Sequence, residues 1–202
     1  MTTKNTKNED YTDRLQTLSH KRWKEVLDVQ RPYRWNLRRL KLSKTLEVGC
    51  GIGRNLKALD KQSVGIDHNK HSIEIAKKDG YIALTTENFR KSKYDKKGTY
   101  NSLLLAHVIE HMSEVNAKEL LNEYKKYLVK NGRVVIICPQ EAGYKSDQTH
   151  KTLFDFEKIE NVLKDVGFEV VKKYSFPLPR FAGKFFKYNE FVVVSIKNLV
   201  VE

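Results

Sequence analysis

The sequence predicts an α/β fold: a doubly wound, mostly parallel sheet of seven strands that ends in an antiparallel C-terminal hairpin and is preceded by N-terminal helices. Short apolar runs alternate with helical patterns from residue 42 onward, as they do in parallel sheets wound on both sides. The runs LLLA and VVIIC carry no polar alternation, which is typical of strands that helices cover on both faces. Together these observations predict one α/β core over residues 42–202.

The first 41 residues are expected to form a polar tail followed by two helices. Residues 12–30 carry apolar side chains on one helical stripe, and Thr12 precedes that stripe as a possible N-cap. Pro32 suits the first turn of a second helix. Its fixed φ is helical, and the N–H that proline lacks would have no hydrogen-bond partner within the helix at that position. Both helices come before the first strand.

Seven strand-like runs and four helical patterns follow. The strands are predicted at residues 45–48, 64–66, 81–84, 102–106, 133–138, 168–174 and 190–196. The helices between them are predicted at residues 53–59, 70–78, 114–130 and 156–166. Ser113 and Asp155 can cap the last two helices, and Asn131-Gly132 is a stop signal for the third.

The last two strands differ from the others. Lys172 and Lys173 lie in the middle of the first of them, and charged side chains are a common device at the edge of a sheet. The segment that joins the two strands has no helical pattern long enough for a crossover connection. The two strands are therefore predicted to pair antiparallel.

Length and composition limit the class of protein. A chain of 202 residues with 40% apolar residues suits one soluble domain, predicted to span residues 1–202. No apolar run approaches the roughly 18 residues of a membrane span, and the N-terminus lacks the apolar core of a signal peptide. Cys50 and Cys138 are far apart and provide no disulfide framework, so free thiols and a cytoplasmic location are expected.

The net charge of the chain is +13, because 38 Lys and Arg residues face 25 Asp and Glu residues. The basic excess is concentrated in residues 21–41 and 90–97. Such an excess suits a phosphate-rich or otherwise anionic partner, and it is equally compatible with an ordinary solvated surface. The charge therefore raises the question of an acidic substrate or a nucleic acid without deciding it.

Three glycines in five residues, Gly49, Gly51 and Gly53, follow the first predicted strand. Ligands of such sheets bind beyond the carboxyl ends of the strands, where the chain order reverses, and glycine lets a ligand approach main-chain N–H groups directly. The dinucleotide fingerprint requires its third glycine where this chain has Arg54, and arginine cannot replace that glycine in close helix packing. No Gly-Lys-Ser/Thr follows, which excludes a Walker phosphate loop.

The segment LEVGCGIG, the Asp67 of VGIDHN and the run LLLAHVIEHM together resemble the class I S-adenosylmethionine-dependent methyltransferases, from about residue 45 to the C-terminus. The resemblance implies a Rossmann-like fold, methyltransferase activity and S-adenosyl-L-methionine as the cofactor. It is closest to the members that methylate small molecules. The residues that it places on the cofactor are Glu47, Gly49, Cys50, Gly51, Gly53, Asp67, His68, Glu87, Asn88, Phe89, Ala106 and His107.

The chemistry of several of these residues supports the resemblance. The Asp67 carboxylate can accept hydrogen bonds from both ribose hydroxyls, and its alternative role is that of a helix N-cap. Glu47 resembles the acid that anchors the methionine ammonium group in this family. Glu87, Asn88 and Phe89 follow the third strand, where the family reads adenine, and their alternative role is that of a polar turn.

The segment from His107 to His111 matches H-x-x-E-H, a zinc-ligand spacing. It follows directly from a buried strand, so His107 is expected to end that strand instead of sharing a helical face with His111. The family commonly carries a similar sequence here without a metal, so no metal is predicted, and Glu110 and His111 are expected to be structural. The candidate catalytic bases are His107 and His150. The loop around His150 is long enough to suggest a lid.

The methyl acceptor is the least determined part of the prediction. An oxygen or nitrogen atom of a small molecule is preferred, in particular an acidic, phosphorylated or saccharide compound. RNA is the alternative, because residues 180–187 mix aromatic and basic side chains that suit a stacked base. A non-catalytic methyltransferase-like subunit is disfavoured by the intact motif residues, and the oligomeric state stays open.

Overall fold

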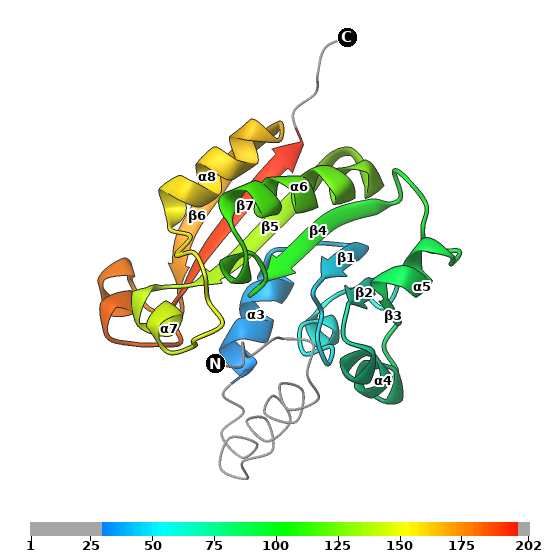
Figure 1. Cartoon of the computed structure of the whole chain (residues 1–202), viewed down its shortest axis with the longest axis horizontal. Helices are drawn as coiled ribbons and strands as arrows, with labels where there is room; N and C mark the ends of the chain where they lie inside the picture. Colours follow the sequence, from blue (N-terminus) through cyan, green and yellow to red (C-terminus); the bar gives the residue numbers. More distant parts are fainter. Residues whose placement is uncertain (1–29, 198–202) are drawn as a thin grey trace. The chain divides into compact units, whose positions relative to one another are not determined.

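The structure is a computed structural model that describes residues 30–197 of the 202-residue chain. The helix predicted for residues 12–30 and its N-cap Thr12 lie outside the described residues, apart from residue 30. The second N-terminal helix is confirmed as α3 (Arg31–Arg39), which has Pro32 in its first turn (Figure 1).

Seven strands form one mixed sheet. They are β1 (Thr45–Val48), β2 (Val64–Asp67), β3 (Ala83–Thr85), β4 (Tyr100–Ala106), β5 (Leu128–Pro139), β6 (Phe168–Phe176) and β7 (Glu190–Lys197). Their order in the sheet is β3-β2-β1-β4-β5-β7-β6. Strand β7 runs antiparallel to both β5 and β6. The predicted fold class is confirmed, including the terminal hairpin and the edge position of the strand that contains Lys172 and Lys173.

The contacts within the chain divide it into two compact units, Met1–Tyr94 and Asp95–Glu202. Each unit is described by itself below. That residues 1–202 form a single domain stays a prediction.

The first unit contributes three parallel strands to the sheet. Every residue of β1 and β2 is buried, and the β1–β2 and β2–β3 pairs are both parallel. Asn69 caps the helix that follows β2, because its side chain accepts from the backbone N–H of Ser72. The helices of this unit after α3 are η1 (Leu56–Ala58), α4 (Lys70–Lys78) and α5 (Thr86–Arg90). Its apolar cluster consists of the buried side chains Cys50, Leu56, Ile73, Ala76 and Ala83.

The second unit pairs β4 parallel to β5 and then turns antiparallel through β7 to β6. Its helices are η2 (Ile109–His111), α6 (Glu114–Tyr124), η3 (Lys125–Tyr127), α7 (Glu141–Lys145), α8 (Phe156–Asp165) and η4 (Arg180–Lys184). Ser113 and Asp155 are confirmed as the N-caps of α6 and α8. These two helices pack against each other, as the upper part of Figure 1 shows.

The helix predicted for residues 114–130 is too long. It ends at Tyr124, one 3-10 turn follows, and strand β5 already begins at Leu128. Leu128 pairs with Tyr100 of β4, so sheet pairing takes over the segment before the stop signal is reached. Asn131 and Gly132 therefore lie inside the strand, where Asn131 takes a φ of 59°.

Within residues 30–197, no helix combines the length and the apolar character needed to cross a bilayer. Cys50 and Cys138 are both buried free thiols, as the sequence predicts. Burial in an apolar core raises the pKa of each thiol, and nearby carboxylates raise it further. Both cysteines therefore act as small core residues instead of reactive groups.

Candidate functional site

The glycine loop follows β1 in the first unit and is held against β2. The backbone N–H groups of Gly49 and Cys50 both donate to the carbonyl of Ile66, at 2.8 and 3.0 Å. Gly49, Gly51 and Gly53 have φ angles of 75°, 52° and 83°. Such positive values are strained for residues with a Cβ, so the loop needs its glycines for its conformation alone.

Two of these glycines face different surroundings. A Cβ on Gly53 would lie 2.8 Å from Cδ2 of Tyr81 and 3.2 Å from Cβ of Ala76, so this glycine allows the loop to pack on its neighbours. A Cβ on Gly51 would meet no atom within 4 Å. The backbone at Gly51 is therefore bare toward open space, which is what a ligand that approaches main-chain atoms requires.

The prediction of a helix over residues 53–59 is wrong. The segment forms turns, and only η1 (Leu56–Ala58) is helical, as a short 3-10 helix. The φ of 83° at Gly53 is incompatible with a helix start there, and Leu59 is already extended. The loop therefore offers a ligand no α-helix dipole, and the N–H groups of its three glycines already donate within the protein.

Asp67 ends β2 and supports the glycine loop. Its carboxylate accepts from the backbone N–H of Gly51 and from that of Asn69, both at 2.8 Å. Asn69 is the N-cap of α4, which removes the capping role considered for Asp67. A carboxylate offers about four acceptor positions, so two remain for the predicted ribose hydroxyls. His68, which was also predicted to contact the cofactor, has Nδ1 3.5 Å from Oδ1 of Asp67.

Glu47 lies within β1 and is 1% exposed. Its Oε1 accepts from the Asn55 amide at 2.8 Å, whereas Oε2 has no hydrogen-bond partner among the described residues. The pKa of Glu47 is raised to about 8, mainly by burial; the hydrogen bond from Asn55 lowers it and the charge of Asp67 raises it. A buried carboxylate oxygen without a donor is costly, and an ammonium group would satisfy it. Glu47 thus fits the role that the resemblance gives it.

The three residues predicted to read adenine are not brought together. Residues 86–90 form helix α5, capped by the Thr85 hydroxyl, instead of a polar turn. The Glu87 carboxylate points to solvent and pairs with Lys91 at 3.0 Å, and Asn88 is exposed. Phe89 is 1% exposed and belongs to the core, so its ring has no free face for an adenine to stack on.

In the second unit, His107 directly follows Ala106, the last residue of β4, which is buried. Its φ is 58°, and its backbone N–H donates to the carbonyl of Ile137 at 2.9 Å. Its Nε2 lies 2.8 Å from Oε1 of Glu190, and its Nδ1 lies 3.3 Å from Oε1 of Glu110. His107 thus ends the strand, as expected from the sequence, with its ring between two carboxylates.

These two carboxylates set the charge of His107. Desolvation lowers the pKa of the imidazole, but hydrogen bonds to Glu110 and Glu190 and their charges outweigh it and raise the pKa to about 10. An imidazolium has no lone pair with which to accept a proton. His107 is therefore poorly suited to the predicted role of catalytic base, and it fits better as a fixed hydrogen-bond donor.

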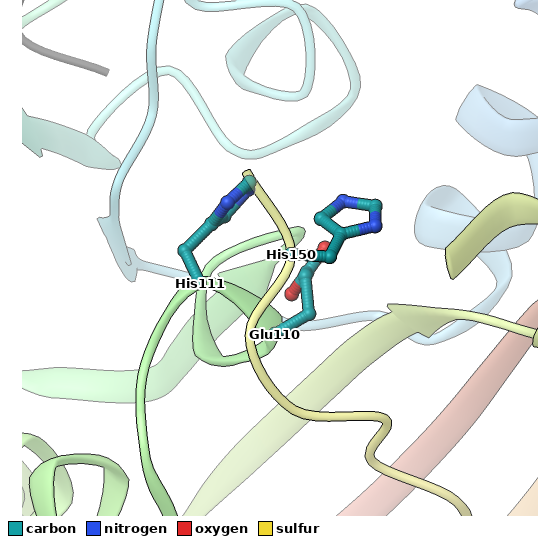
Figure 2. Close-up of side chains that lie close together, drawn as sticks. All are labelled: Glu110, His111 and His150. Atoms are coloured by element: carbon teal, nitrogen blue, oxygen red, sulfur yellow. The ribbon is translucent and has the colours of Figure 1, made fainter. Parts of the chain in front are cut away.

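Glu110, His111 and His150 lie close together and form a second group of candidate functional side chains, called here the Glu110–His111–His150 cluster (Figure 2). The Nδ1 atom of His111 lies 3.2 Å from the carbonyl oxygen of Thr149, and that of His150 lies 2.8 Å from the carbonyl oxygen of Tyr144. The centroids of the two imidazole rings are 4.9 Å apart. Burial lowers the pKa of His111, which favours its neutral form.

Two partners in these sites were not found from the sequence. Asn55 was hidden in the stretch predicted as a helix, and its contact to Glu47 depends on the turn that replaces the helix. Glu190 comes from β7, and only the antiparallel pairing of that strand with β5 brings it to the ring of His107. No local sequence pattern signals either contact.

Comparison with known proteins gives one family match. The family model described as a methyltransferase domain matches residues 8–173. No curated protein matches the sequence.

Several solved structures share the fold. A S-adenosylmethionine-dependent methyltransferase from Archaeoglobus fulgidus is 17% identical, with a TM-score of 0.65 over 86% of this chain and 99% of that one. Magnesium protoporphyrin IX methyltransferase from Synechocystis, solved with S-adenosylhomocysteine bound, is 13% identical, with a TM-score of 0.67 over 96% and 97% of the two chains. A Haloferax volcanii chain, solved in complex with the Trm112 methyltransferase activator, is 12% identical, with a TM-score of 0.69 over 97% and 98%. At such low sequence identities, the similarity to these structures shows a shared fold only.

Proposed function

The chain belongs to the class I S-adenosylmethionine-dependent methyltransferases, and on this basis we propose that it transfers a methyl group to an oxygen or nitrogen atom of a small acceptor that is acidic, phosphorylated or a saccharide. When bound, S-adenosylmethionine supplies the electrophilic methyl group on its sulfonium. The protein has to bind the cofactor and align the acceptor with that group. Alignment of this kind can supply about 7–11 kcal/mol of the barrier.

Two observations carry the proposed cofactor site: Oε2 of Glu47 has no hydrogen-bond partner among the described residues, and the backbone of Gly51 is bare. In the proposal, Glu47 holds the methionyl ammonium group, and the remaining acceptor positions of Asp67 hold the ribose hydroxyls. Asp67 also fixes the loop, since it binds the N–H of Gly51. These three residues lie in one unit of the chain: Asp67 accepts a hydrogen bond from Gly51, and Glu47 and Asp67 lie on adjacent strands.

The proposal of an acidic acceptor rests on charge and on the segment between β6 and β7. The chain carries a net charge of +13. In the segment, Phe181 and Phe185 are 70% and 85% exposed, next to Arg180 and Lys184. Arg180 already pairs with Glu141. Of the two basic residues, Lys184 is therefore the better candidate to bind an anion. Exposed aromatic and basic side chains together also suit a stacked RNA base, which keeps RNA as the second candidate.

Proton removal from the acceptor is the remaining requirement. His107 is held as an imidazolium by its two carboxylates, which leaves His150 as the predicted base. Its Nδ1 faces a carbonyl, so the lone pair of the neutral ring is on Nε2, where it can accept a proton. We also place the enzyme in the cytoplasm, where its two free thiols would stay reduced.

Transfer of labelled methyl from S-adenosylmethionine into a cell extract tests this proposal. The extract is separated after reaction into small metabolites, lipids and RNA. Label in the metabolite fraction is the expected result. Label in RNA that disappears as the salt concentration rises would replace the small-molecule acceptor by RNA. If the chain labels no fraction, although it binds the cofactor, the proposed activity is wrong.

A further inference from the structure

The Glu110–His111–His150 cluster has the composition and geometry of a metal site. One ligand atom from each of the three side chains lies within 4.8 Å of the other two. Figure 2 shows the first two side chains rising from one turn and the third from a separate loop. We propose that these three residues bind a divalent first-row transition-metal ion.

In both histidines, the hydrogen bond at Nδ1 leaves Nε2 available to bind a metal ion. Carbonyl oxygens only accept hydrogen bonds, so the Nδ1 atoms that face Thr149 and Tyr144 carry the protons. The lone pair of each neutral ring is therefore on Nε2. Metal-binding histidines almost always donate their other ring N–H to a carbonyl, a carboxylate or a water.

The carboxylate supplies an independent argument. Glu110 is 1% exposed, and its Oε2 has no hydrogen-bond partner among the described residues. Its Oε1 also lacks a hydrogen-bond partner among the described residues, although it lies 3.3 Å from Nδ1 of His107. An unpaired buried carboxylate oxygen is unfavourable, and a cation bound between it and the two imidazoles would remove this penalty.

The backbone holds the third ligand in place. The carbonyl oxygen of Glu110 accepts from the N–H groups of Lys151 and Thr152, at 2.7 and 3.2 Å. Thr149 is fixed in turn, because both its N–H and its hydroxyl donate to Asp147. The loop that carries His150 is thus tied to the residue that supplies the carboxylate, and no large movement is needed to assemble the site.

Two imidazole nitrogens and one carboxylate oxygen select the class of ion. Mg²⁺ and Ca²⁺ prefer all-oxygen sites, whereas Mn²⁺, Fe²⁺, Co²⁺ and Zn²⁺ accept this mixture. Ligand bonds of about 2.1 Å place tetrahedral ligands about 3.4 Å apart. The three ligand atoms lie within 4.8 Å of one another, so the side chains would have to move closer together to bind the ion. The ligand set differs from the H-x-x-E-H pattern, because His150 replaces His107, whose ring is bound to Glu190.

The role of the ion rests on the proposed function. Three protein ligands leave positions open for an oxygen of the acceptor, and a metal lowers the pKa of an oxygen bound to it. In the metal-bound enzyme, His150 would be a ligand, and the acceptor would need no separate histidine base.

The test uses the full chain without a histidine tag, stripped with a chelator and titrated with Co²⁺ in the absence of substrate. The visible absorption of protein-bound Co²⁺ and calorimetry report the stoichiometry and affinity. We expect one Co²⁺ per chain, and at least a tenfold loss of affinity in H111A, H150A, H150Q and E110Q. His71 lies in the first unit, outside the cluster, so H71A should bind Co²⁺ as the wild type does.

Three results would overturn the inference. The first is that the wild type binds no Co²⁺ at about 1 mM Co²⁺. The second is that folded H150A and H150Q bind Co²⁺ as tightly as the wild type does. The third is that H107Q loses Co²⁺ binding while H150A keeps it. Thermal melts show which variants are folded. S-adenosylmethionine binding is measured on the same samples. Cofactor binding without Co²⁺ binding refutes only the metal site, whereas Co²⁺ binding without cofactor binding refutes only the proposed function.

Discussion

Replacing Asp67 by alanine should lower the affinity for S-adenosylmethionine by about 10- to 150-fold, because hydrogen bonds to a charged group are worth about 1.5–3 kcal/mol. The variant loses the carboxylate proposed to hold the ribose hydroxyls. It also loses the acceptor that binds the N–H of Gly51 at 2.8 Å, so the glycine loop itself is less well held. Isothermal titration of the purified chain measures the effect.

Asp79 provides the matched control for this variant. It is an exposed residue of the same unit, at the C-terminal end of α4, so D79A should keep the wild-type affinity. Equal affinity of D67A, D79A and the wild type would show that the cofactor does not bind at Asp67. Melting curves of both variants separate lost binding from lost folding.

Replacing Glu47 by glutamine should stabilise the ligand-free protein at neutral and alkaline pH. The folded chain raises the pKa of Glu47 from 4.5 to about 8. Between these values the folded state keeps a proton that the unfolded state has released, so the stability of the wild type falls as the pH rises through this window and levels off above it. Relative to E47Q, the wild type should lose about 3 kcal/mol between pH 5 and pH 8. Denaturant unfolding across this range measures the difference.

The same variant should bind S-adenosylmethionine at least about tenfold more weakly, since a neutral amide replaces the carboxylate offered to the ammonium group. Stability and binding are thus expected to change in opposite directions, which a general loss of structure cannot produce. Glu74 is exposed on α4 of the same unit, and E74Q should change neither quantity. A variant E47Q that binds normally and shows the pH dependence of the wild type contradicts the role of Glu47.

The fold could be predicted well where local pattern and tertiary environment agree. β1 and α4 have the predicted bounds, because a short apolar run and a capped amphipathic stretch specify them locally. The misplaced elements lie where long-range contacts decide. The pairing of Leu128 with Tyr100 starts β5 early, and the left-handed Gly53 prevents the helix predicted after the loop.

The candidate sites divide in the same way. The glycine loop and Asp67 are local motifs, so the sequence was enough to place them. Two other features depend on contacts between distant segments. Glu190 reaches His107 only through the pairing of the last strand, and His150 reaches Glu110 only because its loop binds that residue's carbonyl. The charge of His107 follows from the first of these contacts. Glu110 and His111 of the proposed metal site are part of the H-x-x-E-H pattern, but nothing in the sequence places His150 beside them.

The central claim is that the bare backbone at Gly51 receives S-adenosylmethionine, and one pair of variants tests it most directly. Gly51 and Gly80 both have positive φ and open space where a Cβ would lie, so G51A and G80A should each lower the free energy of unfolding by about 1 kcal/mol. Titration with S-adenosylmethionine should show wild-type affinity for G80A and a loss of about tenfold or more for G51A alone. If G51A binds the cofactor as tightly as G80A does, the glycine loop is not the binding site.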